Sequence, residues 1–132
     1  MTSFRAATPL DMPYVLDTFM HTFQGTPWAR GVVASKLLPA CLAHEGWRVT
    51  VAYVDDVPDQ IVGWIAWRDP QTIAWVFARR LHDGAQGMMT KLLEYIGCDL
   101  SREICAAFVT PAAMEIARKR HIKLRFRPFL VC

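Results

Sequence analysis

The stretch TIAWVFARRLHDGAQGMMTKLLEYI, residues 72–96, joins an apolar run to a glycine-containing turn and then to a second apolar run of different periodicity. Residues 72–79 are typical of a buried strand, whereas residues 84–96 repeat apolar side chains at helical intervals. Glycines at a helix start leave backbone N–H groups uncovered at the positive end of the helix dipole. We therefore predict a strand, a turn suited to a phosphate, and a helix, although a plain connection has the same pattern.

Before this stretch, the sequence predicts a short strand over residues 3–7 and a helix that begins with Thr8 as cap, Pro9 in the first turn and Asp11 completing a capping box. Apolar residues recur at helical intervals after the cap, which predicts that this helix packs on a core. They are Leu10, Tyr14, Leu16, Phe19, Met20 and Phe23. A second helical stretch covers residues 32–46 and is interrupted by proline at position 39.

Strands are predicted over residues 47–54 and 61–67, joined by a turn at residues 55–60, and with residues 72–79 they predict an antiparallel meander. Trp64 and Trp75 are expected in its core, and Trp28 is the one tryptophan expected to line a cleft. Further strands are predicted at 104–109 and 124–131, separated by a helix that starts at Thr110 and Pro111 and ends near His121.

Length and composition favour one folded domain over residues 1–132, because 132 residues with 53% hydrophobic side chains are enough for a single core. Apolar runs stay well below the roughly 20 residues of a membrane span, and the polar start has no signal-peptide core, so we expect a cytoplasmic protein. The cysteines Cys41, Cys98, Cys105 and Cys132 are widely spaced. This spacing predicts reduced core thiols, with neither a metal site nor a disulfide framework.

The net charge of +3 is modest, but basic residues gather near the end of the chain. They are Arg118, Lys119, Arg120, Lys123, Arg125 and Arg127. Such a cluster can bind phosphates, or it can be the solvated face of a last helix and an edge strand. No motif with regularly spaced stacking aromatics accompanies it, so nucleic-acid binding is the less favoured interpretation.

The predicted order of strand, two helices, three antiparallel strands, helix, strand, helix and strand resembles the GCN5-related N-acetyltransferase (GNAT) family over essentially the whole chain. The resemblance implies an α/β (α+β) fold with a mixed, mainly antiparallel sheet flanked by helices. In that family the turn after the fourth strand holds the pyrophosphate of acyl-CoA. The family pattern there is Val, any, Pro, two any, Arg or Gln, two any, Gly, any, Gly or Ala.

On this sequence Val76 and Gly84 match the pattern, while Ala78, Leu81 and Gln86 depart from it and Gly87 lies one position beyond. The resemblance implies acetyl-CoA as co-substrate, with its pantetheine arm along the fourth strand beside a bulge and its pyrophosphate over the turn. The implied binding residues are Val76, Phe77, Ala78, Leu81, Gly84, Ala85, Gln86 and Gly87.

The family's second signature, an Asn before the last helix and a Tyr within it, falls on Thr110 and Ala117. Ala113, Ile116 and Lys119 fit the helix pattern, and His121 stands where a glycine is usual. Alanine has no proton to give, so the leaving thiolate would need another donor. No motif fixes a general acid or base, and the catalytic residues stay unassigned. The titratable candidates are His44, Glu45, Asp69 and His82, each of which also fits a solvent-exposed turn or helix end.

Three functions follow from these residues. The first is an acyl-CoA-dependent N-acyltransferase acting on a small-molecule or protein amine, with a homodimer left open. The second is a GNAT-shaped binding or regulatory protein without turnover, suggested by Leu81, Gln86 and Ala117, and similar to short divergent members encoded by tailed phages. The third, ranked last, is a basic nucleic-acid-binding module.

Overall fold

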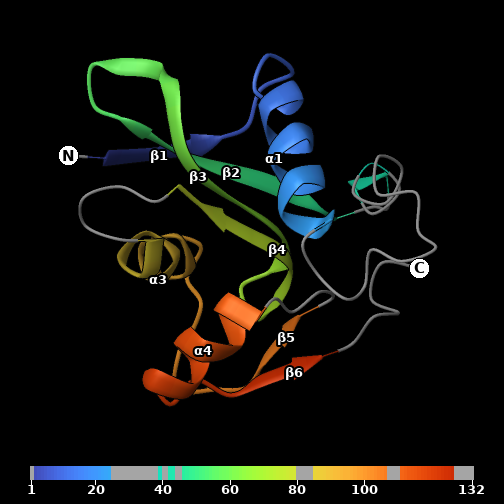
Figure 1. The fold of residues 1–132 in the computed structure, drawn as a ribbon, viewed down its shortest axis with the longest axis vertical. Coiled ribbons are helices and arrows are strands. Elements are labelled where there is room, and N and C mark those ends of the chain that lie inside the picture. The colour runs from blue at the N-terminus through green and yellow to red at the C-terminus, as the bar shows by residue number, and fades with distance from the viewer. Residues whose placement is uncertain are drawn as a thin grey trace.

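The computed structural model describes residues 2–24, 39, 42–43, 46–79, 85–106 and 111–126. In chain order they form β1 (Thr2–Ala6), α1 (Met12–Gln24), β2 (Arg48–Val54), β3 (Val57–Asp69), β4 (Thr72–Ala78), α3 (Ala85–Tyr95), β5 (Ile104–Ala106), α4 (Pro111–Lys119) and β6 (Leu124–Phe126), as Figure 1 traces. Apart from the second helix, this succession confirms the predicted order of elements. The predicted helical stretch at 32–46 falls almost wholly outside the described residues.

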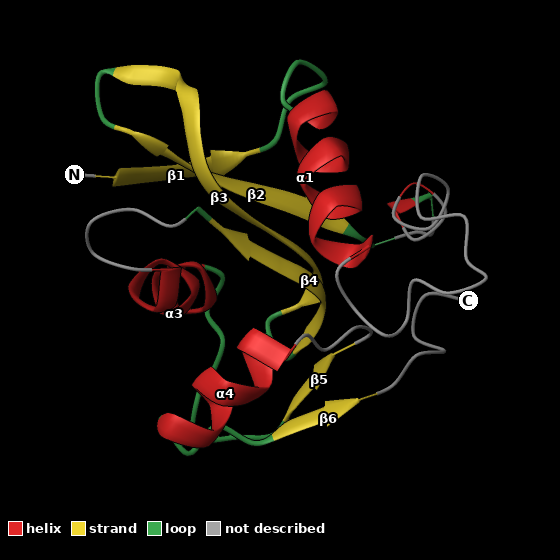
Figure 2. Ribbon diagram, in the orientation of Figure 1, coloured by secondary structure: helices red, strands yellow, loops and turns green. Residues whose placement is uncertain are grey.

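The six strands form one sheet in the order of the sequence. Strands β1 to β4 pair antiparallel, whereas β4–β5 and β5–β6 are parallel pairs (Figure 2). A parallel neighbour needs a long connection that crosses back over the sheet, which α3 and α4 supply. The predicted fold class, a mixed and mainly antiparallel sheet flanked by helices, is confirmed.

Two hydrophobic clusters occupy the two faces of the sheet. Val15 and Phe19 of α1 pack on one face against Trp64 and Trp75, both buried as predicted. Met88, Leu92 and Ile96 of α3 pack on the other face, with Ile65 and Ile104 among their neighbours. Figure 1 shows α1 on one side of the sheet and α3 and α4 on the other. The sheet is therefore covered on both faces, and its central strands read as nearly continuous apolar runs for that reason.

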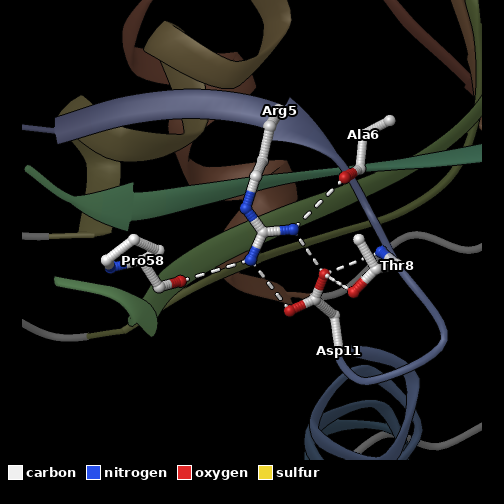
Figure 3. Close-up of polar contacts among 5 residues, drawn as sticks. All are labelled: Arg5, Ala6, Thr8, Asp11 and Pro58. Carbon is white, nitrogen blue, oxygen red and sulfur yellow. Dashed lines mark hydrogen bonds and ion pairs between the residues drawn. The ribbon is translucent and has the colours of Figure 1, made fainter.

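The start of α1 is tied to the sheet by one buried carboxylate (Figure 3). Asp11 accepts a bond from the Thr8 backbone N–H (2.7 Å) and another from its hydroxyl (2.9 Å), and Arg5 of β1 donates a bidentate pair of bonds. The reach of Asp11 back to Thr8 is the predicted half of the capping box, but the Thr8 hydroxyl donates to Asp11 and does not cap. Arg5 holds the pKa of Asp11 well below its usual range.

Three predicted details are wrong. Thr8 was expected to cap the helix with Pro9 in its first turn, but both residues precede α1, which begins at Met12. Leu10 was expected in the core, but it lies in the turn before Met12 and its side chain is 92% exposed. The predicted turn at 55–60 is confined to Asp55 and Asp56, and β3 begins at Val57. Asp56 adopts φ 70°, the left-handed conformation, and Val54 pairs with Val57 across the turn, whereas the register of β2 on β3 shifts between this pair and Tyr53↔Ile61.

Cys98 is a buried thiol, as predicted, and burial raises its pKa to about 11. Of the basic residues near the C-terminus, Arg118 and Lys119 both pair with Glu115 on the exposed face of α4, and Arg125 of the edge strand β6 pairs with Glu103. No helix in the described ranges is both long and apolar enough to cross a bilayer. The cytoplasmic location stays a prediction.

Candidate functional site

The candidate site is the stretch of β4 beyond its short contact with β5. Only Thr72 and Ile73 of β4 pair with described residues of β5, opposite Cys105 and Ala106. The next residue, Ala74, is an extra residue in the β3–β4 ladder, since Trp67 pairs with Ile73 while Ala66 pairs with Trp75. Such a bulge bends a strand and increases its twist. The predicted bulge therefore lies where the described pairing between β4 and β5 stops.

The register of β4 on β3 shows which of its backbone groups face away from β3. The Arg79 N–H donates to the Val62 carbonyl at 2.9 Å, so Ala78 and Gly63 form a non-hydrogen-bonded pair. By alternation, Trp75 and Phe77 exchange hydrogen bonds with β3. The N–H and C=O groups of Val76 and Ala78 then point to the β5 side, where no strand of the described part of the chain pairs with them. Within the described residues, this edge of β4 therefore has backbone groups that no strand pairs with.

Gln71 forms hydrogen bonds that join the start of β4 to the chain leading into β5. Its side-chain amide donates to the carbonyls of Asp99 and Glu103, both at 3.1 Å, and its side-chain oxygen accepts the Asp99 N–H at 2.6 Å. Its backbone carbonyl accepts the Cys105 N–H at 2.8 Å. These bonds hold the chain leading into β5 against the start of β4. The two strands are thus fastened at one end, and the described pairing does not extend along β4.

Gly63 sets the position of α3 over the site. A Cβ atom on this glycine would lie 2.9 Å from the Phe77 carbonyl oxygen, 3.1 Å from Met88 Cγ and 3.3 Å from Leu92 Cδ1. The absence of a side chain therefore lets α3 lie close on β3 and β4. In the first turn of α3, Gly87 has open space: apart from its chain neighbours and its own helix backbone, no atom of the described residues lies within 4 Å of where a Cβ would stand. That space lies at the helix end where backbone N–H groups are left without intrahelical partners.

The structure separates the predicted ligand-binding residues into three groups. Val76, Phe77 and Ala78 lie on β4, but only Val76 and Ala78 direct their side chains to the α3 face, because Phe77 packs with the α1 cluster. Ala85, Gln86 and Gly87 form the first turn of α3. Leu81 and Gly84 lie outside the described residues.

No described residue stands out as the missing acid or base. Ala117, at the family's tyrosine position, is buried in α4. Lys119 and His121 are exposed, and His121 adopts φ 56° just past the end of α4. Asp69 accepts the Gln71 N–H at 3.0 Å, which supports the turn interpretation of that residue. His44, Glu45, His82 and Thr110 lie outside the described residues.

Sequence reasoning missed the two residues that give the site its shape. Gln71 looked like an ordinary turn residue after Asp69 and Pro70, and its three side-chain bonds reach residues about 30 positions away in the sequence. Gly63 looked like a weak point within a strand. A glycine inside a strand pattern is, however, a known sign of close backbone approach, and that signal could have identified it.

Several of the solved structures that are similar to this chain are acetyltransferases. An aminoglycoside antibiotic 6′-N-acetyltransferase from Acinetobacter baumannii has a TM-score of 0.50 at 9% identity, over 92% of this chain and 88% of that one. A ribosomal-protein-alanine N-acetyltransferase from Brucella melitensis has a TM-score of 0.49 at 14% identity, over 96% and 79% of the two chains. An acetyltransferase of the GNAT family from Desulfovibrio desulfuricans has a TM-score of 0.48 at 24% identity.

The last comparison covers 73% of this chain, which spans only 63% of the length of that protein. No protein-family profile and no curated protein sequence matches the chain. The structural likeness to the Acinetobacter baumannii enzyme shows that the protein has the fold of the GCN5-related N-acetyltransferases, as its order of elements predicted. The comparisons give no support to a phage origin.

Proposed function

We propose that the protein binds acyl-CoA, with acetyl-CoA as the expected form, and transfers the acyl group to an amine. The observation that supports this proposal is the edge of β4 at Val76 and Ala78, with which no described strand pairs, beside the first turn of α3. An extended chain with amide groups can add to such an edge as a strand would. The pantetheine arm of CoA is such a chain, and the N-terminus of α3 suits the pyrophosphate at its end.

The reaction needs little from side chains beyond proton transfer. A neutral amine attacks the thioester carbonyl carbon, a C–N bond forms, and the C–S bond breaks with release of the thiolate. The amine proton passes to a base or to water, and the thiolate takes up a proton. Because Ala117 is buried and carries no such group, this last proton comes from water or from another residue.

A matched pair of proline variants tests the binding mode. Val76→Pro removes an N–H that faces away from β3, so the ladder keeps its bonds while the proposed ligand loses a donor. We expect acetyl-CoA affinity, measured by calorimetry, to fall about tenfold or more, the equivalent of one hydrogen bond to a ligand. Ala78→Pro is the fold control, because it places the family's own proline on the same strand edge and shows whether a proline there disrupts β4.

Two results would refute the binding mode: wild-type protein that does not bind acetyl-CoA, or a well-folded Val76→Pro variant with full affinity. Turnover is tested separately by the release of free thiol from acetyl-CoA in the presence of an amine library. Binding without thiol release would favour the second candidate function, a GNAT-shaped binding protein. The buried Ala117 at the family's proton-donor position is the specific observation behind that alternative.

A further inference from the structure

Tyr14 and Phe77 lie together on the α1 face near the end of β4, two residues before Arg79. The Tyr14 ring meets the Phe77 ring edge-on, with centroids 6.3 Å apart and planes at 72°. Phe77 in turn stacks near the buried Trp64, with centroids 6.2 Å apart. This packing holds the half-buried Tyr14 side chain over Phe77, which lies between Val76 and Ala78 in β4.

Arg79 continues the same row. Its N–H donates to Val62, so the strand course extends to this residue, and side chains two apart along a strand share a face. The guanidinium is therefore expected on the face of Phe77 and Tyr14. In agreement, burial raises the pKa of Tyr14 while the charge of Arg79 acts to lower it. Asp17, one turn further along α1, does not contribute to that shift.

The side chains of Tyr14 and Arg79 offer hydrogen-bond donors and a positive charge. Arg79 is exposed, and none of the carboxylates in the described ranges forms an ion pair with it. A tyrosine hydroxyl beside a guanidinium donates to an oxyanion, and arginine suits carboxylates and phosphates because its donors match their geometry. The N-terminus of α3, proposed for the CoA pyrophosphate, lies on the opposite face of the sheet.

We propose that Tyr14 and Arg79 bind an anionic group of the acyl acceptor, a carboxylate or a phosphate, on the α1 face of β4. The proposal rests on the acyltransferase function and names its substrate class: an amine that also carries a negative charge. A polycationic amine would place positive groups next to Arg79 and is expected to be a poor acceptor. The aminoglycoside class modified by a protein of similar fold is therefore not the class expected here.

Matched acceptors test the proposal. Glycylglycine and glycylglycinamide differ in the carboxylate while their amines have similar basicity, and such pairs extend to longer peptides. With acetyl-CoA we expect kcat/KM for the carboxylate member of the best pair to exceed that of the carboxamide about tenfold, the effect of one charge-assisted hydrogen bond. Arg79→Gln should lower the carboxylate rate to that of the carboxamide. Tyr14→Phe keeps the ring contact with Phe77 and should lower the preference in part. Arg102→Gln removes an equally exposed charge elsewhere and should leave the preference intact.

Equal rates for all pairs in the wild type, or an undiminished carboxylate preference in Arg79→Gln, would overturn the proposal. Acetyl-CoA affinity distinguishes the source of the anion: a loss of about tenfold or more in Arg79→Gln would mean that Arg79 holds a CoA phosphate and that the acceptor assignment is wrong. Inorganic phosphate titrated into the 15N-labelled chain without CoA decides the anion site independently. A saturable change in the NMR chemical shift of the Arg79 side-chain N–H supports the anion site even if acetyl-CoA fails to bind. A change that does not saturate refutes the site.

Discussion

The close packing of β4 and α3 around Gly63 predicts that a glycine-to-alanine substitution there and the same substitution at Gly87 have opposite effects on stability. Gly63→Ala would place its Cβ 2.9 Å from a backbone oxygen, which cannot swing away as a side chain can, and 3.1 Å from Met88, which is itself buried. Overpacking of this kind costs about 1–3 kcal/mol. Replacing glycine also lowers the conformational entropy of the unfolded chain, which stabilises the folded state by roughly 0.4–1 kcal/mol. We expect Gly63→Ala to lower the free energy of unfolding by about 1–2 kcal/mol.

Gly87→Ala is expected to act in the opposite direction. Its Cβ would meet no atom within 4 Å, and alanine is favoured over glycine within a helix by up to about 1 kcal/mol. For a chain of 132 residues, 1 kcal/mol corresponds to about 3–4 °C in Tm. Urea unfolding followed by tryptophan fluorescence, together with thermal melting, measures both variants against the wild type.

Acetyl-CoA affinity should nevertheless fall in both variants, because Gly63→Ala displaces α3 and Gly87→Ala fills the space proposed for the pyrophosphate. A general folding defect would not explain a result in which one variant is destabilised, the other is stabilised and both lose acetyl-CoA affinity. A Gly63→Ala protein as stable as the wild type would refute the packing argument, and a destabilised Gly87→Ala protein would refute the open space at the start of α3.

Further predictions concern the fold outside the site. Asp11→Asn should cost about 3 kcal/mol, because it leaves the Arg5 charge without its partner. The pKa of Asp11 is depressed in the folded state, so the ionised carboxylate stabilises the fold above its unfolded pKa near 4, and this stabilisation is lost as pH falls below that. In urea titrations at pH 2–6, the wild type should therefore lose stability more steeply than Asp11→Asn below about pH 4. Arg48 lies over Trp67 of β3, 4.6 Å from the ring centroid, and Arg68 lies over Trp47 just before β2, at 5.4 Å. Arg48→Gln and Arg68→Gln should each cost roughly 0.5–1 kcal/mol, and losses below the error of thermal melts would contradict both contacts. Cys98, with its raised pKa, should resist iodoacetamide at pH 8 in the native protein and react fully in urea, as mass spectrometry of tryptic peptides would show; rapid native labelling would disprove its burial.

Several features of this protein can be read from short stretches of its sequence. Alternating and continuous apolar runs identified the strands of the meander, and helical spacing identified α1 and α3, because backbone periodicity determines which side chains share a face. The contact between Thr8 and Asp11 followed from local capping chemistry, since a cap involves residues only three apart, although α1 begins at Met12. The order of these elements was enough to predict the fold, and the resemblance carried by that order placed acetyl-CoA along β4.

Local reasoning failed where the outcome depends on partners distant in sequence. Leu10 has an apolar side chain at a helical interval, yet the salt bridge between Arg5 and Asp11 holds the chain in a turn that leaves Leu10 in solvent. Only the tertiary structure shows that Gln71 clasps β5 to β4, that Gly63 admits α3, and that Tyr14 approaches the row of Phe77 and Arg79. Periodicity describes one segment at a time, whereas register, close approach and the direction of an unpaired N–H are set by the neighbouring strand.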